Sequence, residues 1–193
     1  MDERMNSMRI LMLGNSFTYY HDLPKLLSVL LNAQATGNTK GGAYLHEQLD
    51  AESDLGRAAL QYLTEEKWDY VVLQEQSKAP IFEREDFSDS VAKLCSLIRQ
   101  NGAVPVLYAS WAYEDGSDRL QATGLSQQEM ARGLYESYHS AAEANGALVA
   151  DVGQAFMALK DQLSLYVDDH YHPSEVGSLL AAHVIAQTIQ QAR

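Results

Sequence analysis

Apolar runs and helical segments alternate along the chain. Four short apolar runs predict strands near residues 9–13, 70–73, 104–109 and 147–150, and a fifth, less marked strand is expected within 36–44. Among these, Tyr70-Val71-Val72-Leu73 is typical of a strand, because aromatic and β-branched residues favour extended chain.

Apolar residues recur at helical spacing between and after these runs. The predicted helices lie at residues 24–31, 58–67, 87–98, 130–142 and 173–184. Pro24 and Pro173 suit the first turn of a helix. The pairs Asn101-Gly102 and Asn145-Gly146 are typical helix ends.

Two reactive side chains are interpreted as structural. Cys95 falls in a helical pattern of apolar residues, where a buried thiol is expected. His183 lies in the last predicted helix and is interpreted as a core histidine. The spacing in that helix predicts a buried face made of Val176, Leu179, Leu180 and Val184.

Strands that alternate with helices predict a parallel sheet with helices on both faces. The predicted runs are too apolar to leave one side of the sheet in water. We therefore expect a three-layer α/β/α fold with about five parallel strands, forming a single domain over residues 1–193. In such sheets ligands bind beyond the carboxyl ends of the strands, so residues that carry chemistry should follow strands.

Composition excludes some functions and compartments. The net charge of −12, from 26 acidic and 14 basic residues, disfavours binding to nucleic acid or to an anionic membrane. One cysteine allows neither an intrachain disulfide nor a cysteine-based zinc site. Residues 1–8 lack the apolar core of a signal peptide, and no apolar run has the length of a membrane helix, so a cytoplasmic protein is expected.

Ser16 follows the first predicted strand directly, in the block Gly14-Asn15-Ser16-Phe17-Thr18. Gly14 permits a sharp turn, which would present the serine at the mouth of the sheet. A serine hydroxyl becomes a useful nucleophile only when a base removes its proton. Without such a base, Ser16 would be an ordinary helix-capping or turn residue.

A base is available near the other end of the chain, in the segment Asp168-Asp169-His170-Tyr171-His172-Pro173. The spacing lets the carboxylate of Asp169 reach Nδ1 of His172, which leaves Nε2 free to face a serine. A metal site that uses His170, His172 and an aspartate is one alternative. An acidic loop that caps the last helix is another.

Polar groups and aromatics follow the other predicted strands. Gln74 or Gln76 could donate an amide N–H to a developing oxyanion, and a glycine at 41 or 42 could let a backbone N–H approach a ligand. Trp111 and Tyr113 are candidates to line a substrate pocket, with core packing as the alternative for each.

Taken in order, these blocks resemble the SGNH/GDSL hydrolase superfamily across nearly the whole chain. A bacterial subgroup that carries G-N-S-F-T and L-Q-E-Q-S is most similar. The resemblance implies a flavodoxin-like fold, with Ser16 as nucleophile, His172 as base and Asp169 as the residue that holds His172. It also implies an oxyanion hole from the backbone N–H groups of Ser16 and Gly42 and one side-chain amide.

The chain departs from the family pattern at two blocks. Asn15 stands where many members have aspartate, and Gln74-Glu75-Gln76-Ser77 replaces G-x-N-D. Direct spacing favours Gln76 as the amide donor, whereas a Q-G-E version found in some carbohydrate acetylesterases favours Gln74. The choice between them stays open.

These observations predict a serine esterase that hydrolyses a carboxylic ester through an acyl-enzyme on Ser16. A short acyl group on a carbohydrate is the substrate that the glutamine block and the aromatics favour. No metal or organic cofactor is expected, and the predicted partner is a small-molecule ester. The alternatives are a non-catalytic α/β module that binds a small ligand and a metal-dependent hydrolase.

Overall fold

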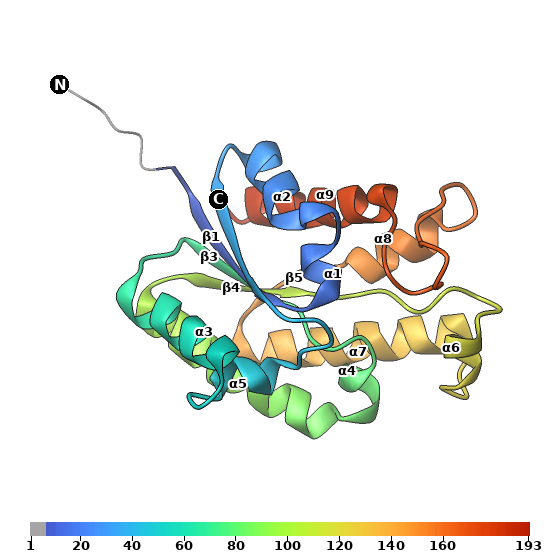
Figure 1. The fold of residues 1–193 in the computed structure, drawn as a ribbon, viewed down its shortest axis with the longest axis horizontal. Coiled ribbons are helices and arrows are strands. Elements are labelled where there is room, and N and C mark those ends of the chain that lie inside the picture. Colours follow the sequence, from blue (N-terminus) through green and yellow to red (C-terminus); the bar gives the residue numbers. More distant parts are fainter. Residues whose placement is uncertain (1–6) are drawn as a thin grey trace.

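The computed structural model describes residues 7–193 and has a five-stranded parallel sheet with the order β2-β1-β3-β4-β5 (Figure 1). The strands are β1 (Arg9–Gly14), β2 (Gln34–Thr39), β3 (Tyr70–Leu73), β4 (Val104–Tyr108) and β5 (Leu148–Ala150). This order is the flavodoxin-like one, in which successive strands are added on one side of β1 and then, from β3 onward, on its other side. The predicted parallel sheet and strand number are confirmed.

Helices cover both faces of the sheet, as predicted. The longer ones are α2 (Leu23–Leu31), α3 (Asp54–Glu65), α5 (Arg84–Asn101), α7 (Gln127–Asn145), α8 (Val152–Leu159) and α9 (Glu175–Gln191). The short ones are α1 (Ser16–Tyr19), η1 (Tyr20–Asp22), η2 (Leu45–Leu49), α4 (Ala79–Phe82) and α6 (Asp118–Gln121). In Figure 1, α2, α8 and α9 lie on one side of the sheet and α3, α5 and α7 on the other.

Alternation along the strands divides the core between these two layers. In β1, Ile10 and Met12 pack with α2, α8 and α9, whereas Leu11 and Leu13 pack with α3, α5 and α7. This is the period of two expected for a strand buried on both faces. Cys95 of α5 is fully buried among these apolar side chains, and burial raises the pKa of its thiol to about 11, which confirms its structural interpretation.

Two predictions about elements were wrong in detail. The second strand begins at Gln34 and ends at Thr39, earlier than predicted, and its side chains are exposed or half-buried because it forms the edge of the sheet. The last helix begins at Glu175, after Ser174 caps it by accepting a hydrogen bond from Gly177 N–H at 3.1 Å.

The predicted buried face of α9 was wrong in part, since Leu180 and Val184 are half-buried against the core but the other residues are not. Val176 and Leu179 are exposed, and His183 is exposed rather than a core histidine. The helix buries mainly small residues and isoleucines instead, namely Gly177, Ser178, Ala181, Ala182, Ile185, Ala186 and Ile189. Small side chains let α9 lie close to α2, against which it packs. Among residues 7–193, no helix has the length and apolar character needed to cross a membrane.

Candidate active site

Ser16 is the first residue of α1, directly after the turn that leaves β1. The Asn15 side chain caps α1 by accepting a hydrogen bond from Phe17 N–H at 3.1 Å, and its amide donates to the carbonyl of Ala43 at 3.0 Å. A methyl group at Gly14 would lie 2.8 Å from Gln74 Oε1, so the turn has no room for a side chain there. The serine is therefore held at the carboxyl end of a central strand, as predicted.

Asp169 and His172 belong to a tight loop before α9. The loop is closed by a bridge between Tyr166 and Pro173 and by a 3.1 Å bond from Val167 N–H to the carbonyl of His172. Asp169 Oδ1 accepts the backbone N–H of His172 at 2.9 Å, and Oδ2 lies 2.6 Å from His172 Nδ1. The carboxylate thus fixes both the loop and the imidazole ring.

The pKa of Asp169 is shifted by its surroundings. Partial burial acts to raise it, but hydrogen bonds from the His172 side chain and from the backbone N–H groups of His172 and Tyr171 outweigh burial and hold the pKa below its ordinary value. The carboxylate is therefore ionised at neutral pH and can stabilise a positive charge on His172.

The fold brings the two ends of the chain together at these residues. His172 Nε2 lies 2.8 Å from Ser16 Oγ, which is the contact that the sequence predicts. Both side chains are almost completely buried. Tyr20 stacks on the imidazole with ring centroids 4.3 Å apart and an interplanar angle of 3°, and Phe17 meets it edge-on. In this arrangement His172 can accept the serine proton while Asp169 stabilises the imidazolium that forms.

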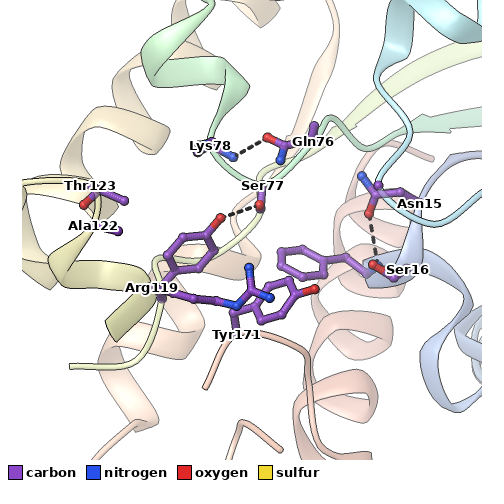
Figure 2. Close-up of a pocket in the computed structure, with 12 residues that line it drawn as sticks. Asn15, Ser16, Gln76, Ser77, Lys78, Arg119, Ala122, Thr123 and Tyr171 are labelled. Carbon is purple, nitrogen blue, oxygen red and sulfur yellow. Dashed lines mark hydrogen bonds between the residues drawn. The ribbon is translucent and has the colours of Figure 1, made fainter. Parts of the chain in front are cut away.

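A pocket of about 280 Å³ opens beside Ser16 (Figure 2). It lies beyond the carboxyl ends of the strands, where this class of fold binds ligands. Its lining residues come from the segments after β1, β2, β3 and β4 and from the loop before α9. They are Asn15, Ser16, Phe17, Gly42, Gln76, Ser77, Lys78, Tyr113, Arg119, Ala122, Thr123 and Tyr171.

Gln76, rather than Gln74, faces this pocket. Gln74 is buried, and its Oε1 accepts hydrogen bonds from Asn15 N–H at 3.0 Å and from Thr18 Oγ1 at 2.9 Å, so it supports the serine turn. In Gln76, Oε1 accepts the N–H groups of Lys78 and Ala79, which leaves its amide nitrogen toward the pocket (Figure 2). The alternative of Gln74 as a donor to a ligand was wrong, because its side chain points under the turn.

Gly42 also lines the pocket and has a φ of 69°, a conformation that suits glycine. Within the part of the chain that the structure describes, no hydrogen bond uses the N–H of Gly42 or of Ser16. These two N–H groups and the Gln76 amide can therefore donate hydrogen bonds to a ligand oxygen in the pocket.

The two predicted pocket aromatics have different places. Trp111 is fully buried between Phe17 and Phe156, with ring centroids 4.5 and 4.1 Å away, and its indole N–H donates to the carbonyl of Tyr171 at 2.9 Å. Trp111 therefore packs behind Phe17 and Tyr171 and does not line the pocket, so its assignment to the pocket was wrong. Tyr113 does line the pocket, and its hydroxyl lies 2.7 Å from Ser77 Oγ.

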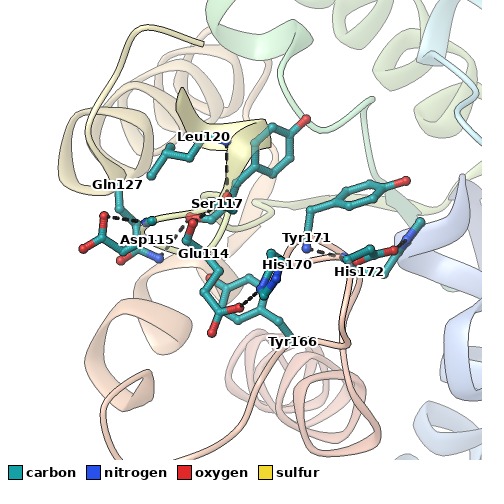
Figure 3. A network of polar contacts seen from close by, with 12 residues as sticks. Glu114, Asp115, Ser117, Leu120, Gln127, Tyr166, His170, Tyr171 and His172 are labelled. Atoms are coloured by element: carbon teal, nitrogen blue, oxygen red, sulfur yellow. Dashed lines mark hydrogen bonds and ion pairs between the residues drawn. The ribbon is translucent and has the colours of Figure 1, made fainter. Parts of the chain in front are cut away.

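His170 turns away from His172 and pairs with another loop. Its Nδ1 lies 2.7 Å from Glu114 Oε2, and its φ is 65°. Residues 7–193 contain no group of three or more His, Cys, Asp or Glu side chains that could hold a metal ion. His170 therefore serves to join the loop of residues 166–174 to the segment after β4 (Figure 3).

Sequence reasoning missed Glu75, Arg119 and Tyr20. Glu75 is 1% exposed, and burial raises its pKa to about 7. Arg119 lies on the four-residue helix α6, which is too short for a periodic signal. The tyrosine pair at 19–20 directly follows the serine block, and that proximity was the one available signal for Tyr20.

The chain matches no family model and no curated protein sequence, but it is similar to several solved structures. A protein from Slackia heliotrinireducens assigned to the SGNH hydrolases is 40% identical, with 95% of this chain and 100% of that chain covered and a TM-score of 0.90. Axe2, an acetylxylan esterase from Geobacillus stearothermophilus, is 15% identical over 94% of each chain, with a TM-score of 0.69. A protein of the G-D-S-L lipolytic family from Desulfitobacterium hafniense is 18% identical over 94% of this chain and 99% of that one, with a TM-score of 0.70.

Proposed function

Because the chain belongs to the SGNH/GDSL superfamily of ester hydrolases, we propose that it cleaves a carboxylic ester through an acyl-enzyme on Ser16. One observation carries the proposal. Ser16 Oγ lies 2.8 Å from His172 Nε2, and His172 Nδ1 lies 2.6 Å from Asp169 Oδ2. This continuous chain of hydrogen bonds is the geometry that activates a serine hydroxyl.

The first half-reaction forms the acyl-enzyme. His172 takes the proton of Ser16 as Oγ attacks the ester carbonyl carbon, and the carbonyl oxygen becomes an oxyanion. The backbone N–H groups of Ser16 and Gly42 and the side-chain amide of Gln76 stabilise that charge. The C–O bond to the alcohol then breaks, and the alcohol leaves with the proton that His172 held.

The second half-reaction releases the acid. His172 takes a proton from a water molecule, which attacks the acyl carbonyl of the Ser16 ester. The same N–H donors hold the second oxyanion until the bond to Ser16 Oγ breaks and His172 returns the proton to Oγ. Asp169 keeps the imidazole in one tautomer throughout and stays ionised, in keeping with its lowered pKa.

A short acyl group on a carbohydrate is our proposed substrate class. The pocket is small, at about 280 Å³, and its walls mix hydroxyl, amide and aromatic groups, which suits a hydroxylated ligand with a small acyl group. Axe2, whose fold is similar, acts as an acetylxylan esterase.

Reaction with a fluorophosphonate probe and hydrolysis of nitrophenyl acetate test this function together. We expect the chain to be labelled once, and Ser16→Ala to lose labelling and at least about 10⁴-fold in kcat. Ser96→Ala is the matched control, because Ser96 is an exposed serine of α5 that does not line the pocket beside Ser16. Absent labelling would instead favour a module that only binds its ligand. Chelator-sensitive hydrolysis that survives Ser16→Ala would favour a metal-dependent enzyme.

A further inference from the structure

The pocket beside Ser16 has a positively charged wall in an acidic protein. Its lining includes Arg119 and Lys78 but no aspartate or glutamate. The chain has 26 acidic and only 14 basic residues, with a net charge of −12. A pocket with cations alone is therefore opposite in sign to the rest of the molecule, and a cleft of one sign attracts ligands of the other.

Arg119 is held over an aromatic ring at this wall. Its guanidinium carbon lies 3.8 Å from the centroid of the Tyr171 ring, a cation–π contact (Figure 2). Within residues 7–193, no carboxylate lies at ion-pair distance from Arg119. The edge of the guanidinium, which carries its N–H donors, is thus available to a ligand.

The segment that carries Arg119 is fastened to the loop that carries His172 (Figure 3). Glu114 N–H donates to the carbonyl of His170 at 2.9 Å, and Glu114 Oε2 lies 2.7 Å from His170 Nδ1. Ser117 then caps α6 by accepting the N–H of Leu120 at 3.2 Å. These bonds fix α6 relative to the base.

Tyr171 connects the cation to the reacting groups. The same ring that supports Arg119 lies with its centroid 3.9 Å from that of the His172 imidazole. One aromatic ring therefore separates the guanidinium from the base. A group bound by Arg119 would belong to the same small molecule as the ester that His172 and Ser16 attack.

We propose that the substrate carries a negatively charged group, such as a carboxylate, sulfate or phosphate, which Arg119 and Lys78 bind beside the scissile ester. This inference rests on the proposed esterase function and narrows its substrate class. The planar fork of arginine binds such groups through two parallel hydrogen bonds, and Lys78 adds a second positive charge.

Two matched pairs of esters test the proposal and locate the charge. On the acyl side, nitrophenyl hemisuccinate is compared with nitrophenyl butyrate. On the alcohol side, the acetate ester of 4-hydroxybenzoate is compared with that of 4-hydroxybenzamide. We expect one charged ester to have a kcat/KM about 10- to 100-fold above its neutral partner, the range of a charge-assisted contact.

Variants of Arg119 assign that preference to the pocket wall. Arg119→Gln should lower kcat/KM for the charged ester about 10-fold or more beyond any change for its neutral partner, which removes most of the preference. Arg119→Lys should keep part of the preference, because it retains the charge and loses the fork. Arg132→Gln, at an exposed arginine of α7 outside this pocket, is the control and should keep the preference in full.

The outcomes separate this inference from the proposed function. Equal rates for both members of each pair, or an equal loss on both in Arg119→Gln, would overturn the charged substrate and leave the esterase intact. If the chain hydrolyses none of the four esters and takes up no fluorophosphonate, the esterase function fails and the inference falls with it.

Discussion

Replacing Glu75 by glutamine is expected to change how the stability of the protein depends on pH. Glu75 follows β3 and is almost completely buried. Its Oε1 accepts the backbone N–H of Leu45 at 3.0 Å and that of Gln76 at 2.6 Å. It therefore ties the segment after the Gly42 turn to the segment that carries Gln76.

The surroundings of Glu75 raise the pKa of its carboxyl group. Burial is the largest cause, and the negative charges of Glu83 and Glu47 add to it. The hydrogen bonds from the N–H groups of Gln76 and Leu45 act in the opposite direction, and the net pKa is about 7 instead of 4.5. Near neutral pH the group is thus poised between its two forms.

The sign and size of the effect follow from that difference. Between pH 4.5 and about 7 the folded chain keeps a proton that the unfolded chain has released, so the free energy of unfolding falls as pH rises. At about 1.4 kcal/mol for each pH unit, the full contribution is about 3 kcal/mol. Glutamine stays neutral and keeps an Oε1 acceptor, so Glu75→Gln removes this fall in the free energy of unfolding with rising pH.

Urea unfolding at pH 5 and pH 8 measures the effect. Relative to the wild type, Glu75→Gln should gain about 2.5 kcal/mol in unfolding free energy between the two pH values, because part of the full contribution is already lost at pH 5. Glu85→Gln, at an exposed glutamate of α5, should gain almost nothing. A stability difference between Glu75→Gln and wild type that stays constant within about 0.5 kcal/mol would refute the reasoning.

Three further substitutions test the site and its support. Asp169→Asn should lower kcat about 10⁴-fold with little change in KM, because the carboxylate that holds His172 and stabilises its charge is lost. Steady-state assays of ester hydrolysis measure both constants. Gln76→Ala should lower kcat about 10²- to 10³-fold if its amide meets the oxyanion, and unchanged kcat would remove it from that role. Gly153→Ala should lower the free energy of unfolding by about 1–3 kcal/mol, because its methyl group would overlap the carbonyl oxygen of Ser110, and thermal melting checks this.

The layers of the fold could be predicted because burial on both faces leaves a plain apolar signal. β1 and β3 are buried along nearly their whole length, and both were predicted within a residue. The edge strand β2 has polar and half-exposed residues, so no such signal marks its ends. In α9 the large apolar residues misled the assignment, since close packing against α2 selects alanines and glycine for the buried face.

The two ends of the site could be predicted because they come directly after β1 and directly before α9. The middle could not, because the choice between Gln74 and Gln76 depends on how the chain bends after β3, where Gln74 turns under the serine to meet Asn15 and Thr18. Arg119 escaped notice for a different reason. Its place is set by hydrogen bonds between two loops far apart in the sequence, which leave no local pattern.

The separation of 156 positions between Ser16 and His172 has a consequence for the biosynthesis of the protein. Ser16 leaves the ribosome early, at the end of the first strand, and its base is translated only after the sheet strands are complete. A nascent or truncated chain that ends before His172 lacks the base, so its Ser16 is expected to be inert. Labelling of ribosome-bound chains by a serine-directed probe would then report the moment at which the loop that carries His172 has folded against Ser16.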